Sequence, residues 1–97
     1  MLNIKRLMNE SDLPEYMVQG MENYVNSGVR PGGFLSVLLS NDLIETFSRA
    51  DSENKKVIEQ WVVFAYNYLP SDCWGSSKKV DDWIDKGGYN IPPYETK

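Results

Sequence analysis

The first long pattern in the chain is a row of apolar positions at steps of three and four, the spacing of one helical face. Asp12 and Glu15 stand where a capping box would place them, so we expect the helix to begin there. Gly28 is expected to end it in the left-handed conformation, and residues 1–11 to form a frayed lead-in. The apolar face consists of Leu13, Tyr16, Met17, Gly20, Met21, Tyr24 and Val25.

The next apolar segment, residues 34–50, contains a polar interruption. Residues 30–33 predict a turn in which Gly32 supplies the positive φ of a type II turn, with a second helix starting near Phe34. Serine, asparagine and aspartate compete with a helical backbone, so residues 40–42 predict a break, after which Asp42 caps a new helix. The alternative is one longer helix, because Leu35, Leu39, Leu43 and Phe47 continue a row at steps of four.

Two further helices are predicted in the second half of the chain. The first, from Val57 to Leu69, is apolar on nearly all sides, so we expect neighbours to bury it on most sides until Pro70 ends it. A short last helix is capped by Ser76 or Ser77 and closed by the glycines at 87 and 88. The tail, residues 89–97, is either docked or loose. The pattern therefore predicts a single all-α domain over residues 1–97, with four to five short helices.

Composition excludes several classes of chemistry. The 97 residues include no histidine and one cysteine, which removes histidine-dependent triads, Cys/His dyads, histidine-containing zinc sites and disulfide frameworks. The net charge is −4 and the basic residues are scattered, which disfavours nucleic-acid binding. No apolar run approaches the length of a membrane span, and residues 1–10 are too polar for a secretory signal. We therefore expect a cytoplasmic protein with no membrane contact, metal or cofactor.

One group of polar residues is a candidate ligand site. The turn before the second helix could hold an anion, because a helix N-terminus offers free N–H groups beside the Arg30 guanidinium. The simpler interpretation is a turn that only connects two helices. Elsewhere, Cys73 is expected to be packed rather than reactive, since no base is present to activate it. The candidate ligand-binding residues are Arg30, Gly32, Gly33, Asn41, Asp42 and Asn67.

The aromatic residues are the least explained part of the composition. Three tryptophans, six tyrosines and three phenylalanines exceed what the core of a chain this short needs, and tryptophan and tyrosine are favoured at binding hot spots. Some of these rings should therefore reach a surface. The candidate interaction residues are Tyr16, Tyr24, Tyr66 and Trp74.

Several short segments resemble a family of small proteins from tailed bacteriophages and prophages. The segments are RPGGFL at 30–35, LSNDL at 39–43, RAD at 49–51 with Asn54, YN at 66–67, and Pro70 followed by CWGS at 73–76. The resemblance implies a phage accessory protein that works in the cytoplasm of a bacterial host, and it carries no catalytic residue across.

Together these observations lead us to expect a non-enzymatic protein that occludes a host or phage macromolecule, or associates with itself, through an aromatic-edged helical surface. The alternative is a small-ligand binder that sequesters an anionic metabolite or nucleotide signal at residues 30–33. The two differ in what the structure should contain. A pocket suited to an anion would favour the second, and an exposed apolar surface the first.

Overall fold

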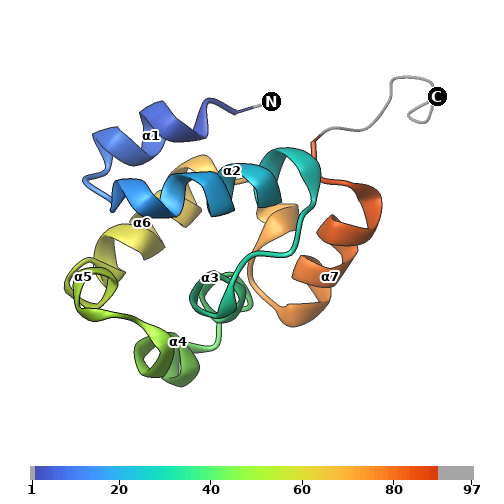
Figure 1. Ribbon diagram of the computed structural model, residues 1–97. Coiled ribbons are helices and arrows are strands. Elements are labelled where there is room, and N and C mark those ends of the chain that lie inside the picture. The colour runs from blue at the N-terminus through green and yellow to red at the C-terminus, as the bar shows by residue number, and fades with distance from the viewer. Residues whose placement is uncertain (1, 90–97) are drawn as a thin grey trace.

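The computed structural model describes residues 2–89, which fold as helices joined by short turns and contain no strand (Figure 1). The predicted fold class is confirmed, although the described residues contain seven α-helices rather than four or five. In chain order the elements are α1 (Ile4–Glu10), η1 (Glu15–Met17), α2 (Val18–Ser27), α3 (Gly33–Leu39), α4 (Leu43–Arg49), α5 (Ser52–Lys56), α6 (Ile58–Tyr68), η2 (Ser71–Cys73) and α7 (Ser77–Lys86). Of the predicted tail only Tyr89 is described, and residues 90–97 lie outside the described residues.

The segment expected to be a frayed lead-in is instead a helix that belongs to the core. In α1, the side chain of Asn3 accepts a hydrogen bond from the Arg6 N–H, which caps the helix. Ile4 and Met8 are fully buried, and α1 packs against α2 and α6. These two residues are four positions apart and so lie on one helical face.

The predicted start of the next helix is wrong, and its predicted end is confirmed. Asp12 has a φ of 58°, a left-handed conformation in which it does not act as the N-cap. The chain first makes the 3-10 turn η1, and α2 begins only at Val18. Gly28, with a φ of 70°, ends α2 in the predicted left-handed conformation.

The polar interruption at residues 40–42 separates two helices, as predicted. Asn41 has a φ of 64°, which ends the path of α3, and the Asp42 carboxylate accepts a hydrogen bond from the Glu45 N–H to begin α4. The predicted type II turn is wrong, however. Gly32 has a φ of −66° and extended backbone, because it serves as the N-cap position of α3 rather than as a turn residue.

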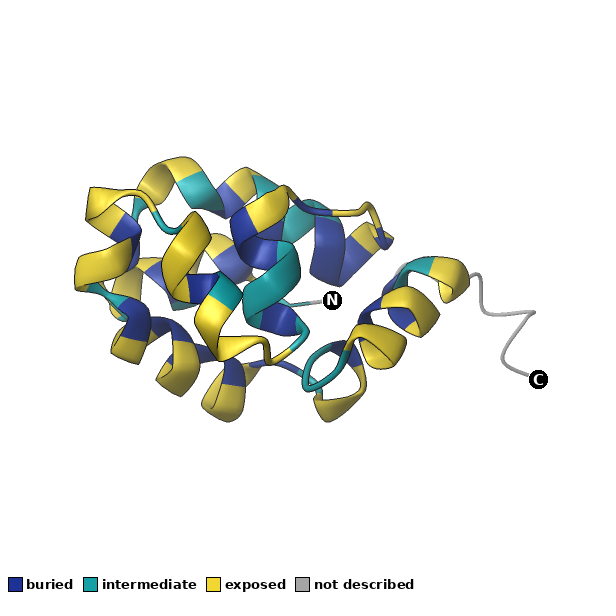
Figure 2. Ribbon diagram, turned by 90° about the horizontal axis from the view of Figure 1, so that it is seen from below, coloured by how far each residue is buried: buried dark blue, intermediate teal, exposed yellow. Residues whose placement is uncertain are grey.

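The central helix is less enclosed than the sequence predicts. On α6, Trp61 and Phe64 are fully buried, and the Trp61 ring meets that of Phe34 edge to face with centroids 6.0 Å apart. The opposite side of the helix, which carries Val62, Val63 and Tyr66, is exposed. The prediction of burial on most sides is therefore wrong, because α6 lies at the margin of the bundle and buries one face only (Figure 2).

The last helix is fixed to α2 through backbone contacts. Ser76 caps α7 by accepting from the Lys79 N–H, and Gly87 ends it with a φ of 85°, both as predicted. The Trp83 indole N–H donates to the carbonyls of Tyr24 and Val25, at 3.1 Å each. The backbone at residue 88 lies so close to the end of α2 that a Cβ there would be 2.7 Å from the nitrogen of Gly28.

Candidate functional site

At residues 30–33, the predicted anion site, the structure shows Arg30 paired within the chain. Arg30 points to α7, where its guanidinium lies 2.7 Å from the carboxylate of Asp81. Gly32 and Gly33 are exposed at the start of α3, which has only seven residues. The Arg49 guanidinium also approaches this turn, and its Nη1 lies 3.1 Å from the place a Cβ on Gly33 would take. The turn connects α2 to α3.

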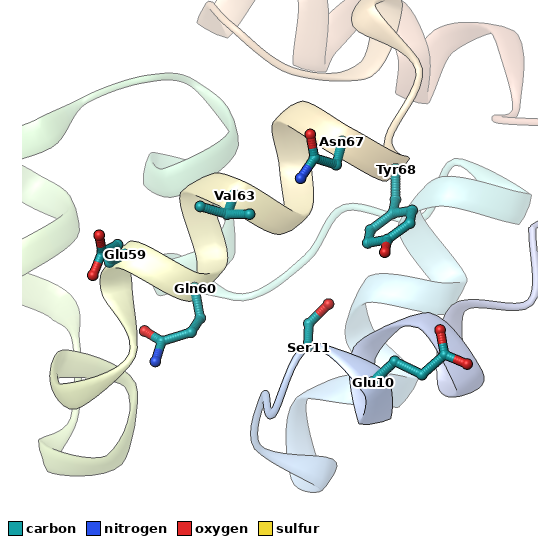
Figure 3. A pocket seen from close by; sticks show the side chains of 7 residues that line it. All are labelled: Glu10, Ser11, Glu59, Gln60, Val63, Asn67 and Tyr68. Atoms are coloured by element: carbon teal, nitrogen blue, oxygen red, sulfur yellow. The ribbon is translucent and has the colours of Figure 1, made fainter.

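The other predicted ligand residues lie apart from this turn and in different places. Asp42 is the N-cap of α4, and Asn41 lines a small hollow between α4 and α6. Asn67 lines a cleft of about 350 Å³ between the end of α1 and the outer side of α6 (Figure 3). The charged residues of that cleft, Glu10 and Glu59, are both acidic, so its lining disfavours an anion.

A second cleft, of about 270 Å³, lies beside α7 and is lined by groups of both charges. Its lysines already have partners within the chain. Lys79 donates to the Ser71 carbonyl at 3.1 Å, and the Lys86 ammonium lies 4.0 Å from the centroid of the Trp83 ring. These contacts hold the loop at η2 and the end of α7 in place.

Two of the four predicted interaction residues hold the fold together. Tyr24 is fully buried, its hydroxyl donates to the Cys73 carbonyl, and burial raises its pKa. Tyr16 is 59% exposed, but its hydroxyl donates to the Asp51 carboxylate at 2.5 Å, and this hydrogen bond raises the pKa of Tyr16 to about 12. Asp51 in turn caps α5 by accepting from the Asn54 N–H, so Tyr16 ties η1 to α5.

The other two predicted residues, Tyr66 and Trp74, form an aromatic pair at the surface. Tyr66 is 75% exposed, and its ring lies edge to face with that of Trp74, with centroids 6.4 Å apart. The Trp74 indole nitrogen is buried and has no hydrogen-bond partner among the described residues. A buried donor without an acceptor costs about 1–3 kcal/mol, so this pair is not optimised for the stability of the isolated domain.

Sequence reasoning missed the apolar residues that extend this pair across α4. Leu43, Ile44 and Phe47 are exposed on α4, with Ile44 at 81%. Leu43 and Val62 line opposite sides of the hollow between α4 and α6, which measures about 50 Å³. Val62 is one turn from Tyr66 on α6, so the exposed residues are continuous. We call this the α4–α6 surface, and it consists of Leu43, Ile44, Phe47, Val62, Tyr66 and Trp74.

The break at Asn41 explains why α4 shows its apolar side to solvent. In one continuous helix, Leu43 and Phe47 would follow the buried Leu35 and Leu39 into the core. The left-handed residue changes the direction of the chain, and the buried position on α4 is Thr46 instead. The sequence does contain a signal for this surface. The apolar row at steps of four continues through Leu43 and Phe47, beyond the polar break at residues 40–42.

The only thiol of the chain precedes Trp74 in sequence and is not exposed on this surface. Cys73 is fully buried, and burial raises its pKa to about 12, which disfavours the thiolate. Among residues 2–89, no three side chains of the metal-binding types lie close enough to hold an ion. Within the same residues, no helix has both the length and the apolar character needed to cross a bilayer.

Comparison with protein-family models, with curated proteins and with solved structures gives no match to this chain. The α4–α6 surface is consequently the best candidate for a functional site, and it is judged by its own geometry.

Proposed function

We propose that this chain is a non-enzymatic binding protein that acts by occlusion, through the α4–α6 surface, on a protein partner. The observation that carries the proposal is a continuous exposed apolar surface with an aromatic edge. Small monomeric domains seldom expose contiguous apolar groups of this kind unless the groups are covered in a complex. Tyrosine and tryptophan are also the side chains most enriched where binding energy is concentrated.

The exposure of the α4 residues gives the scale of the interaction. Covering an exposed leucine, isoleucine or phenylalanine side chain completely is worth about 1.5–3 kcal/mol. Leu43 and Ile44 are 66% and 81% exposed, so most of that value is still available to a partner at both positions. With contributions from Phe47, Val62 and Tyr66, the total gross gain is several kcal/mol, from which the entropy cost of association must be subtracted.

The state of the ionisable groups supports action by contact rather than by catalysis. The Cys73 thiol and the Tyr24 hydroxyl are buried with raised pKa values, so neither is poised to act as a nucleophile near neutral pH. Arg30 is paired with Asp81, and Lys78 with Asp82, each at 2.7 Å. The resemblance to small phage proteins supports action in the cytoplasm of a bacterial host.

Photo-crosslinking inside bacteria that produce the chain tests this function. A benzophenone amino acid replaces Tyr66, on the surface, or Val29, a control position that is 51% exposed in the loop after α2. We expect an adduct from position 66, its loss when Ile44→Glu is added to the same chain, and no adduct from position 29. An adduct that forms equally at both positions, or that persists with Ile44→Glu, would contradict the proposal.

A further inference from the structure

Building on the proposed function, we infer that the partner segment which covers the α4–α6 surface is basic and amphipathic, and that it places a lysine or arginine side chain in the cleft between α1 and α6. The cleft and the surface adjoin on the outer side of α6. Val62 belongs to the surface and Val63 lines the cleft, and these successive residues are each half exposed. Tyr66 is one turn from both, so one bound segment can contact the surface and reach the cleft.

The charge of the cleft selects a cation. Its charged lining residues, Glu10 and Glu59, are both acidic, and no lysine or arginine among the described residues lines it. Within residues 2–89, Glu59 forms no ion pair, and Glu10 lies 3.8 Å from Arg6 in a pair exposed on both sides. Exposed pairs are weak, so Arg6 leaves Glu10 available to an incoming cation. The net charge of −4 also favours the approach of a basic partner.

The cleft also contains the apolar contacts that the stem of a basic side chain requires. Lysine and arginine lay their methylene groups along apolar surface while the charged head stays in polar surroundings. Val63 and the Tyr68 ring, both labelled in Figure 3, provide this apolar surface. The Tyr68 ring packs on that of Phe64, with centroids 5.8 Å apart, which fixes its position. An aromatic ring also attracts a cation over its face.

Amide and hydroxyl groups of the cleft supply acceptors for the charged head. The side-chain oxygens of Gln60 and Asn67 are such acceptors. The Ser11 hydroxyl donates to the Leu7 carbonyl at 2.9 Å, so its oxygen can still accept a hydrogen bond. Lysine and arginine heads carry several N–H donors and no acceptor, and the lining therefore matches them in hydrogen bonding as well as in charge.

The occupant is a side chain of the partner rather than a free amine. An ion pair that is open to water adds little affinity by itself, so an isolated amine has too few contacts to stay bound. A cation on a segment that also covers Val62 and Tyr66 is held in place by those apolar contacts. The volume of the cleft, about 350 Å³, is sufficient for one long side chain. The α4–α6 surface thus supplies most of the affinity, and the cleft supplies the preference for basic segments.

Two fluorescein-labelled peptides test this inference with defined probes. Both carry the same leucines, spaced three and four residues apart, and their remaining positions are lysine in one peptide and glutamate in the other. We expect fluorescence anisotropy at low salt to show about tenfold or more tighter binding of the lysine peptide. Added salt should reduce this preference, because it screens exposed charges. Tyr66→Ala should weaken the binding of the lysine peptide, since it removes an apolar contact without changing the charge.

Substitutions in the cleft locate the preference. Glu10→Gln combined with Glu59→Gln should reduce it to about threefold or less, because the cation then loses both carboxylates. Asp82→Asn combined with Asp85→Asn is the matched control on α7, since it removes two exposed carboxylates, one of them from an exposed pair with Lys78. We expect the control to retain the full preference. Unchanged melting temperatures confirm that both double variants are folded.

The inference and the proposed function fail in different ways. Equal binding of the two peptides, binding of neither, or a preference that the cleft substitutions leave unchanged overturns the basic partner. So does lysine-peptide binding that Tyr66→Ala leaves unchanged. If the photo-adduct from position 66 still forms and depends on Ile44, the proposed function stands with a partner of different chemistry. If that adduct is also absent, both proposals fall.

Discussion

The contact between α2 and α7 makes a quantitative prediction, because two neighbouring glycines differ in one respect only. Gly87 and Gly88 both have left-handed backbone, with φ of 85° and 68°. A Cβ on Gly87 would meet nothing within 4 Å, whereas one on Gly88 would lie 2.7 Å from the nitrogen of Gly28 and 2.8 Å from the Val25 carbonyl oxygen. Both of those atoms are backbone and cannot swing aside.

The alanine substitutions separate strain from collision. Left-handed backbone costs an L-residue about 1–2 kcal/mol, so Gly87→Ala should lose about that much stability. Gly88→Ala carries the same strain, and in addition the collision, which at the usual cost of overpacking adds about 1–3 kcal/mol. The loss of unfolded-state entropy is the same for both substitutions and cancels in the comparison.

Urea unfolding followed by circular dichroism measures both variants under the same conditions. A difference of about 2 kcal/mol between them corresponds to a gap of roughly 8–16 °C in melting temperature for a domain of this size. Gly88→Ala should be the less stable of the two. Equal stability of the two variants would refute the reasoning, since it would mean that the ends of α2 and α7 are not in backbone contact.

Three further predictions concern hydrogen bonds of single side chains. The Tyr16 hydroxyl lowers the pKa of Asp51 below its ordinary 3.8, so this stabilisation is complete above that value and is lost as pH falls through the folded pKa. Asp51→Asn should remove that part of the acid dependence when urea midpoints are compared from pH 6 down to about 2, and an unchanged dependence would argue against the pair. Tyr24→Phe leaves the buried Cys73 carbonyl without its donor and should lower the free energy of unfolding by about 1–3 kcal/mol; a neutral effect would show that water or another donor replaces it. Asp42→Ala removes the cap of α4 and should lower it by about 1 kcal/mol, whereas Asp42→Ser should retain most of the stability.

The helix ends that the sequence predicts correctly depend on short-range chemistry. Gly28 and Gly87 take left-handed conformations, and Asp42 and Ser76 cap the helices that follow them. Each of these capping and helix-ending residues acts within one turn of helix, so its effect can be predicted without knowledge of the fold. The all-α class follows from the same local signals together with the helical period.

The two errors near the start of the chain have different causes. Nothing within residues 1–11 shows that Ile4 and Met8 will be covered by α2 and α6, and that cover makes the segment helical. Asp12 has the sequence of a cap but takes a left-handed conformation, which delays α2 until Val18. For Ile4 and Met8 the deciding contacts are with residues distant along the chain. For Asp12 they are local, because the Leu13 N–H donates to the Met8 carbonyl and Asp12 is part of the turn that ends α1.

The sequence predicts that an aromatic surface is exposed, but not where on the molecule it lies. The aromatic surplus points to exposed rings, and Tyr66 is one of them, yet composition cannot tell it from Tyr24, which is fully buried. The apolar residues of α4 continue a row that begins in the core, so only the change of direction at Asn41 reveals that Ile44 faces solvent. The direction that α4 takes after Asn41 is a property of the whole fold and cannot be derived from the local sequence pattern.

The three tryptophans differ enough in their surroundings to provide an intrinsic fluorescence assay. Trp61 and Trp83 are almost wholly enclosed and donate hydrogen bonds to the chain, so their emission should be blue-shifted and insensitive to acrylamide. Trp74 is half-buried at the edge of the α4–α6 surface beside Tyr66, and a dissolved quencher should therefore act mainly on its emission. Protection of that quenchable fraction on titration with a partner would report occupancy of the surface without any label.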